Sequence, residues 1–144
     1  MPSVFDVAKY ILERTGPMST MKLQKLVYYA QAWSLVWDEE PLFDERIEAW
    51  ANGPVVPDLF NVHKGRYKVS EKFFRKADSS SLSGEQEDTI NAVIKFYGDK
   101  SPQWLSDLTH SEGPWREARR GIPEGERGDS IITLESMAEY YESL

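Results

Sequence analysis

The segment between Pro17 and Pro41 constrains the fold most strongly. Ser19 or Thr20 can cap a helix there, and helical spacing continues to about Trp37. The apolar side chains of this segment cover most of the helix circumference; they are Leu23, Leu26, Val27, Tyr28, Tyr29, Ala30, Trp33, Val36 and Trp37. A helix with so wide an apolar surface must be packed on more than one side. We therefore predict that it is the central helix of the fold.

Capping and stop residues predict further helices around the central one. The predicted helices span 3–14, 57–63, 83–97, 102–110, 113–118 and 134–141. Short extended pieces are expected at 42–43, 47–50 and 67–69, and loops at 77–84 and 121–129. The sum is a mainly α fold, a compact single-domain helical bundle over residues 1–144 with a central apolar helix and a few short strands.

The composition restricts the class of protein. A chain of 144 residues, 40% of them hydrophobic, has the size and core-forming content of one globular domain. It lacks cysteine, which excludes disulfides and thiolate metal sites. No apolar stretch approaches 18 residues, and the N-terminal residues have no long apolar core of the kind found in signal peptides. We expect a cytoplasmic protein that does not enter a membrane.

The formal net charge of -7 favours a partner with a basic surface, through electrostatic steering. One segment departs from this acidity: residues 64–76 hold Lys64, Arg66, Lys68, Lys72, Arg75 and Lys76 together with Tyr67, Phe73 and Phe74. The segment is either a nucleic-acid contact or a solvated face whose aromatic rings belong to the core. We favour the solvated face, so nucleic acid is not the expected partner.

No pattern in the chain indicates catalysis, a cofactor or a metal ion. His63 and His110 fall where last helical turns are predicted, a position that histidine favours. Glu48 lies in an apolar stretch, so we expect a buried, paired acid. It either bonds backbone amides near Gly53 or meets a cation of a partner, and we favour the structural role. Phosphate-loop, dinucleotide and serine-elbow motifs do not occur, so we expect a protein that is not an enzyme.

One block, residues 21–60, is far more specific than the rest. It combines M-K-L-Q-K-L-V-Y-Y-A-Q-A-W, P-L-F-D-E, I-E-A-W and N-G-P-V-V-P-D-L-F in that order. This block resembles the signature of the Panacea domain family, also called SocA-like or GepA-like phage-associated proteins. Asn52 departs from the aromatic residue expected before Gly-Pro. The structural signature residues are Leu23, Leu26, Tyr29, Trp33, Glu48, Trp50, Gly53, Pro54 and Pro57.

The resemblance implies a function that neither the composition nor the periodicity of the chain indicates. Its members are mostly helical antitoxins of bacterial or prophage toxin-antitoxin pairs, and they neutralise a cognate toxin by direct protein-protein binding. One branch acts as a proteolytic adaptor that delivers its toxin to a protease. The alternatives for this chain are therefore an adaptor of that kind, or a nucleic-acid-binding regulator that uses residues 64–76.

Two sets of residues are candidates for contact with the partner. The first is polar and lies on the signature helix: Lys22, Gln24, Lys25 and Gln31. The second is acidic and follows that helix: Asp38, Glu39 and Glu40, with the loop 121–129 as a further contact. For Gln24 and Gln31 we favour an internal role, in which they hold the backbone of the turn at Gly53.

Overall fold

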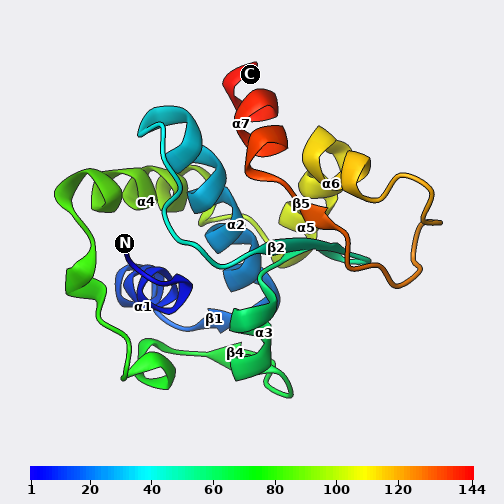
Figure 1. Cartoon of the computed structure of the whole chain (residues 1–144). Helices are drawn as coiled ribbons and strands as arrows, with labels where there is room; N and C mark the ends of the chain where they lie inside the picture. Colours follow the sequence, from blue (N-terminus) through cyan, green and yellow to red (C-terminus); the bar gives the residue numbers. More distant parts are fainter.

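Helix α2 (Thr20–Trp37) runs through the middle of the fold in the computed structural model, which describes all residues 1–144 (Figure 1). The hydroxyl of Ser19 caps the helix by accepting a hydrogen bond from the Lys22 amide at 3.2 Å. Every residue from Leu23 to Ala32 is buried. The prediction of a central helix packed on more than one side is confirmed.

Six further α-helices surround α2, with ends within about two residues of the predicted ones. They are α1 (Val4–Thr15), α3 (Pro57–His63), α4 (Gly84–Tyr97), α5 (Pro102–Ser111), α6 (Gly113–Ala118) and α7 (Leu134–Glu142). Reciprocal capping boxes start α1 at Ser3 and α4 at Ser83, as the sequence predicts. Short 3₁₀ turns, η1 (Glu71–Phe74) and η2 (Ser79–Ser81), interrupt the loops. The fold is mainly α, as expected.

Five short strands form two small antiparallel sheets. Strands β1 (Met18–Ser19) and β4 (Lys68–Val69) make one pair. The second sheet has the order β3-β2-β5 and consists of β3 (Gly53–Val55), β2 (Ile47–Trp50) and β5 (Ile131–Ile132). A tight turn after Trp50 reverses the chain, and Trp50 is paired with Gly53. The sheet thus joins the signature block to a strand near the C-terminus, in which Ile131 pairs with Glu48 and Ile132 with Ile47.

The helices pack on α2 from several directions. Helices α4 and α7 lie against it, and α5 contacts both α2 and β3 (Figure 1). Helix α6 lies between α7 and β5, while α1 packs on η1 and η2. A single core of buried hydrophobic residues, from Val4 to Tyr141, runs through these elements. None of the helices combines the length and the apolar composition needed to cross a membrane.

Gln31 explains why the extended strand expected at 42–43 does not form. Its side-chain Oε1 accepts hydrogen bonds from the amides of Leu42 at 2.6 Å and Phe43 at 3.3 Å, and its Nε2 donates to the Phe43 carbonyl at 2.8 Å. A side-chain amide therefore takes the place of a neighbouring strand. Leu42 and Phe43 are buried, so these backbone groups would otherwise lack a partner.

Gln24 holds the other end of the same segment. Its Oε1 accepts the Val56 amide at 2.9 Å, and its Nε2 donates to the Val56 carbonyl at 3.3 Å. The internal role expected for Gln24 is close to what the structure shows, since Val56 directly follows β3. For Gln31 the expected place was wrong, because Gln31 bonds residues 42–43 and not the turn at Gly53. Together the two amides fix residues 42–56 on α2.

Replacing Gln31 with leucine keeps its size but removes its hydrogen bonds. Because two buried amides and one carbonyl lose their partners, the Gln31→Leu variant should lose about 2–4 kcal/mol of unfolding free energy in urea titrations. The matched control is Gln103→Leu, whose side chain is exposed, and it should stay within about 0.5 kcal/mol of the parent. Equal unfolding free energies for the two variants would contradict the role assigned to Gln31.

Candidate partner-binding surface

A buried carboxylate links the C-terminal third of the chain to α2. Glu112 Oε1 accepts hydrogen bonds from the hydroxyls of Tyr29 and Tyr141, each at 2.7 Å. The hydroxyls of Tyr28 and Tyr141 are 2.9 Å apart. No basic side chain pairs with Glu112, and burial raises the pKa of its carboxyl. This network ties α6 and α7 to the signature helix, which is a structural task.

Lys25 is buried without a carboxylate partner. The side chain is only 2% exposed, and its Nζ lies 3.5 Å from the Pro54 carbonyl oxygen. Burial lowers the pKa of Lys25 to about 8. Gly53 covers the lysine: its φ is +128°, and a Cβ there would lie 2.5 Å from Lys25 Cε. Gly53 of the signature is therefore needed both for its backbone conformation and for its lack of a side chain.

The polar residues of the signature helix are mostly internal. Gln24, Lys25 and Gln31 are 3%, 2% and 1% exposed, so a partner docking on this conformation cannot reach them. The expectation that these three contact a partner needs this correction, because each side chain faces backbone groups of residues 42–56. Lys22 is half-buried and donates from Nζ to the Gly98 carbonyl at 2.6 Å, where it stabilises the C-terminus of α4.

Glu48 is a buried, paired acid, but its partners are not the expected ones. Its Oε2 accepts from Arg46 Nε at 2.8 Å, and its Oε1 accepts from Trp50 Nε1 at 2.9 Å. Arg46 directly precedes β2 and Trp50 ends it, so each lies two residues from Glu48, the spacing at which side chains of an extended chain share one face. Arg46 is exposed and lies 3.9 Å from Asp58. Glu48 thus bonds the side chains of two residues near it in the chain and not the backbone near Gly53.

The two histidines occupy the last turns of α3 and α5, as the sequence predicts. His63 is buried, and its Nε2 lies 3.0 Å from Gln24 Nε2. The His110 ring stacks on Trp115 with 4.0 Å between centroids, and its Nε2 has no hydrogen-bond partner. Burial lowers the pKa of both imidazoles. Both rings thus belong to the packing of helix ends.

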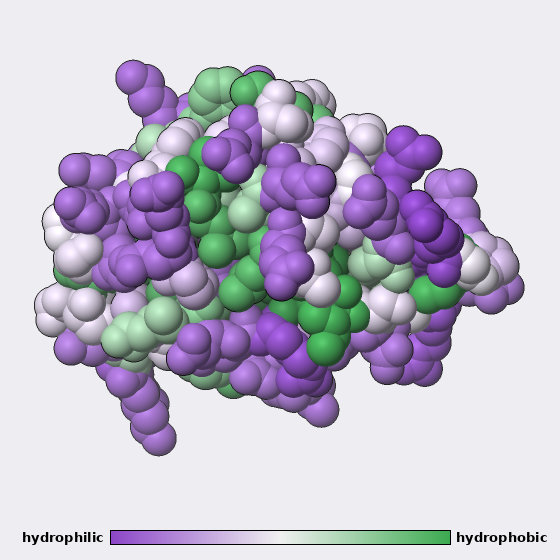
Figure 2. Space-filling view, turned by 45° about the horizontal axis from the view of Figure 1, so that its top comes forward, coloured by the Kyte–Doolittle hydropathy of each residue, from purple (hydrophilic) through white to green (hydrophobic).

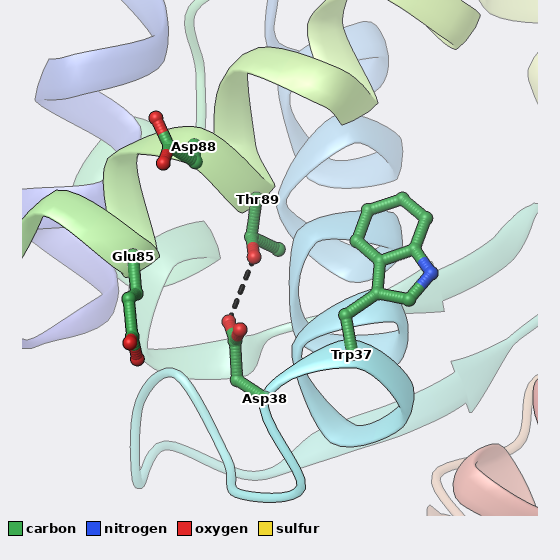
Figure 3. Close-up of a pocket in the computed structure, with 5 residues that line it drawn as sticks. All are labelled: Trp37, Asp38, Glu85, Asp88 and Thr89. Atoms are coloured by element: carbon green, nitrogen blue, oxygen red, sulfur yellow. Dashed lines mark hydrogen bonds between the residues drawn. The ribbon is translucent and has the colours of Figure 1, made fainter.

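Asp38, the first of the acidic residues that follow α2, lines a pocket at the surface. This pocket holds about 420 Å³ and is lined by Trp37, Asp38, Glu85, Asp88 and Thr89 (Figure 3). The first two residues end α2, while the other three come from the first two turns of α4. We call it the acidic pocket. Packing of α4 against α2 brings these two stretches together.

In the acidic pocket a hydrogen bond holds Asp38 in place, whereas the two acidic side chains that α4 contributes are free in solvent. Asp38 Oδ2 accepts a hydrogen bond from the Thr89 hydroxyl at 2.7 Å, while Glu85 and Asp88 are exposed beside it (Figure 3). The indole of Trp37 is 50% exposed and stacks on Trp33 with centroids 4.9 Å apart. Figure 3 shows the carboxylates of Glu85 and Asp88 pointing away from one another and the Trp37 indole pointing away from Asp38, so the region offers separate acidic and aromatic contacts to basic side chains.

The sequence found only part of this pocket. Asp38 was predicted as a contact residue, and it lines the pocket; Glu39 and Glu40 are exposed in the turn that follows. Glu85 and Asp88 were missed, since acids in a first turn are explained by the helix dipole alone. Glu112 was missed as well, because its tyrosine partners lie 83 and 29 residues away in the chain.

A second hollow lies between residues 43–47 and 131–134. It holds about 180 Å³, and the exposed Ile131 and Leu134 form part of its wall. Figure 2 shows a strip of apolar surface across one face of the molecule, bordered by hydrophilic residues.

The loop 121–129 is held by Arg119, which donates to the carbonyls of Ala49 at 3.0 Å and Glu126 at 2.6 Å. This loop is exposed, as expected.

Residues 64–76 form the basic part of the surface. All six of their lysine and arginine residues are exposed. Phe74 is buried and Phe73 is partly buried, as expected for rings that belong to the core. For Tyr67 the expectation is wrong, because its side chain is 81% exposed.

The buried Lys25 predicts a pH-dependent stability. Its pKa of about 8 lies below the 10.5 of an ordinary lysine, so the folded chain binds fewer protons than the unfolded chain between these values. The cost of burying the charge, about 3 kcal/mol, is present below pH 8 and disappears as the pH rises to 10.5. The unfolding free energy of Lys25→Met minus that of the parent should therefore fall by about this amount from pH 7.5 to 10.5. A difference that stays constant with pH would contradict the burial of Lys25.

Comparison with known proteins supports the resemblance seen in the sequence. A family described as "Antitoxin SocA-like, Panacea domain" matches residues 23–116, which run from α2 into α6. Antitoxin SocA of Caulobacter vibrioides (strain NA1000 / CB15N) is 30% identical over 128 residues. That match covers 76% of this chain and 66% of the relative, just under two thirds of its length. No solved structure matches the chain. This chain belongs to the SocA-like Panacea domain family of antitoxins.

Proposed function

We propose that this protein is an antitoxin that neutralises a cognate protein toxin by direct binding, and that the acidic pocket is the centre of the contact. The family match and the antitoxin SocA relative support the class of function. The observation that carries the place of contact is the exposed Trp37, which stands beside Asp38, Glu85 and Asp88.

The pocket has the properties of an interaction hot spot. Tryptophan and arginine are enriched at such positions, and a ring already packed on one side loses little conformational freedom when a partner covers it. Trp33 provides that support for Trp37, and the Trp33 indole N–H is itself bonded to the Tyr97 hydroxyl at 3.0 Å. Basic side chains of the toxin would stack on Trp37 and pair with the carboxylates. The net charge of -7 would speed the encounter with a basic toxin.

Neutralisation by binding requires no catalytic residue in this chain. We assign Glu112 and Lys25 to the fold, because each lies in the interior and contacts groups of other elements. An antitoxin must meet its toxin in the same compartment. A chain without cysteine suits the reducing cytoplasm, where we place this protein.

An adaptor that delivers the toxin to a protease is the second candidate. An adaptor needs two binding surfaces at the same time. The hollow at residues 43–47 and 131–134 shares no residue with the acidic pocket, and it exposes Ile131 and Leu134. This second surface favours the adaptor as the alternative. Degradation of the toxin by a cellular protease only when this protein is present would support it.

The direct test is co-expression of this protein with the product of the neighbouring gene. We expect rescue of growth and co-purification of the two proteins. Trp37→Ala should weaken the complex about 30-fold or more, the effect of losing a hot-spot residue. The pair Glu85→Lys and Asp88→Lys should slow association about tenfold at low salt and reduce its salt dependence.

The matched control changes the same number of charges elsewhere. Asp107 and Glu117 are exposed on α5 and α6, so Asp107→Lys with Glu117→Lys should leave the affinity within about threefold of the parent. A neighbour that is harmless and does not bind would contradict the proposed function. A stable complex that is insensitive to Trp37→Ala would leave the antitoxin role intact but remove the acidic pocket as its contact.

A further inference from the structure

The charge of this acidic protein is strongly segregated. Residues 64–76 hold six basic residues and one acid, Glu71. None of the six basic side chains takes part in an ion pair. We call this segment the basic face. A cluster of exposed cations without counter-ions in the protein repels itself, unless an anion from outside is bound there.

The backbone of the basic face is held rigidly. The Thr20 amide donates to the Tyr67 carbonyl at 2.9 Å, and the Thr20 hydroxyl donates to the Arg66 carbonyl at 3.2 Å. Strand β4 pairs with β1 next to these bonds. At the other end, Lys9 Nζ donates to the Ala77 carbonyl at 2.9 Å. A ligand that binds here would therefore order little of the backbone.

Aromatic side chains stand among these cations. In the chain Tyr67 stands between Arg66 and Lys68; it is 81% exposed, and no other ring stacks on it. The Arg66 guanidinium lies over the Phe73 ring, 4.7 Å from its centroid. An uncovered aromatic ring flanked by cations is the combination with which proteins bind unpaired bases and their phosphates.

We propose that the basic face binds single-stranded nucleic acid, with a base stacked on Tyr67 and phosphates paired with Arg66, Lys68 and Arg75. This activity goes beyond the proposed binding of a toxin and is independent of it. The basic face adjoins the first turn of α2, whereas the acidic pocket adjoins its last turn. An 18-residue helix spans about 27 Å, so both surfaces can be occupied together.

The helix dipole reinforces this separation. The positive end of α2 lies beside the basic face, and its negative end lies beside the acidic pocket. The molecule thus presents surfaces of opposite charge at the two ends of its central helix. A polyanion is drawn to one end and a basic protein to the other.

The test is fluorescence anisotropy with a labelled 12-nucleotide oligothymidine at low salt. We expect binding that weakens steeply as salt increases. Tyr67→Ala should reduce the affinity about 5- to 100-fold, while Tyr67→Phe should retain it because the stacking ring remains. The triple variant Arg66→Glu, Lys68→Glu and Arg75→Glu should lose at least about tenfold. All these side chains are exposed, so each variant should fold like the parent, which circular dichroism would check.

A charge-matched control separates the basic face from the net charge. Lys95→Glu, Arg116→Glu and Arg120→Glu change the net charge equally at exposed positions of other elements, and this variant should bind better than the Arg66, Lys68 and Arg75 variant. An equal loss for both triple variants would overturn the proposal. So would the absence of binding at low salt, or an affinity unchanged by Tyr67→Ala. Binding to anionic vesicles or self-association through these cations, without binding of the oligonucleotide, would also overturn it.

Discussion

The hydrogen bonds between the amide side chains of Gln24 and Gln31 and the backbone of residues 42–56 are the interaction on which this fold depends. These residues form an irregular stretch and a hairpin, which alone cannot satisfy their buried backbone groups. The central helix supplies the missing partners from within its buried surface. For this reason the helix has glutamine at two buried positions where packing alone would favour an apolar residue. The residues of the signature block therefore serve mainly to hold the fold together.

Local signals were sufficient for most of the helices. Caps such as Ser3 with Asp6 and Ser83 with Gln86 act within one turn, so the sequence predicted these helix starts correctly. The breadth of the apolar surface also identified α2 as central. The strand expected at 42–43 failed for a non-local reason, since its hydrogen-bond partner is a side chain of α2 and not another strand. The partners of Gln31 could not be predicted without knowing that residues 42–43 pack against α2.

The candidate site shows the same limit. Asp38 was predicted because it follows the signature helix, but Glu85 and Asp88 join it only through the packing of α4 on α2. Glu112 gave no signal in the sequence, since its tyrosine partners lie 83 and 29 residues away in the chain. Burial also separated residues that the sequence grouped together: Lys25 is internal, whereas Lys22 reaches the surface and binds the end of α4. The middle of α2 thus serves the fold, and the two proposed binding surfaces lie at its ends.

Hydrogen-deuterium exchange of this protein, free and in complex with the proposed toxin, separates the residues of the fold from those of the proposed contact. We expect the proposed toxin to slow exchange at residues 37–40 and 84–89. The exchange of residues 42–43 and 56, whose amides bond to Gln31 and Gln24, should be slow and should not change on binding. Faster exchange at 42–43 and 56 in the complex, with no protection at the acidic pocket, would contradict both expectations. The signature residues would then be released to form the interface themselves.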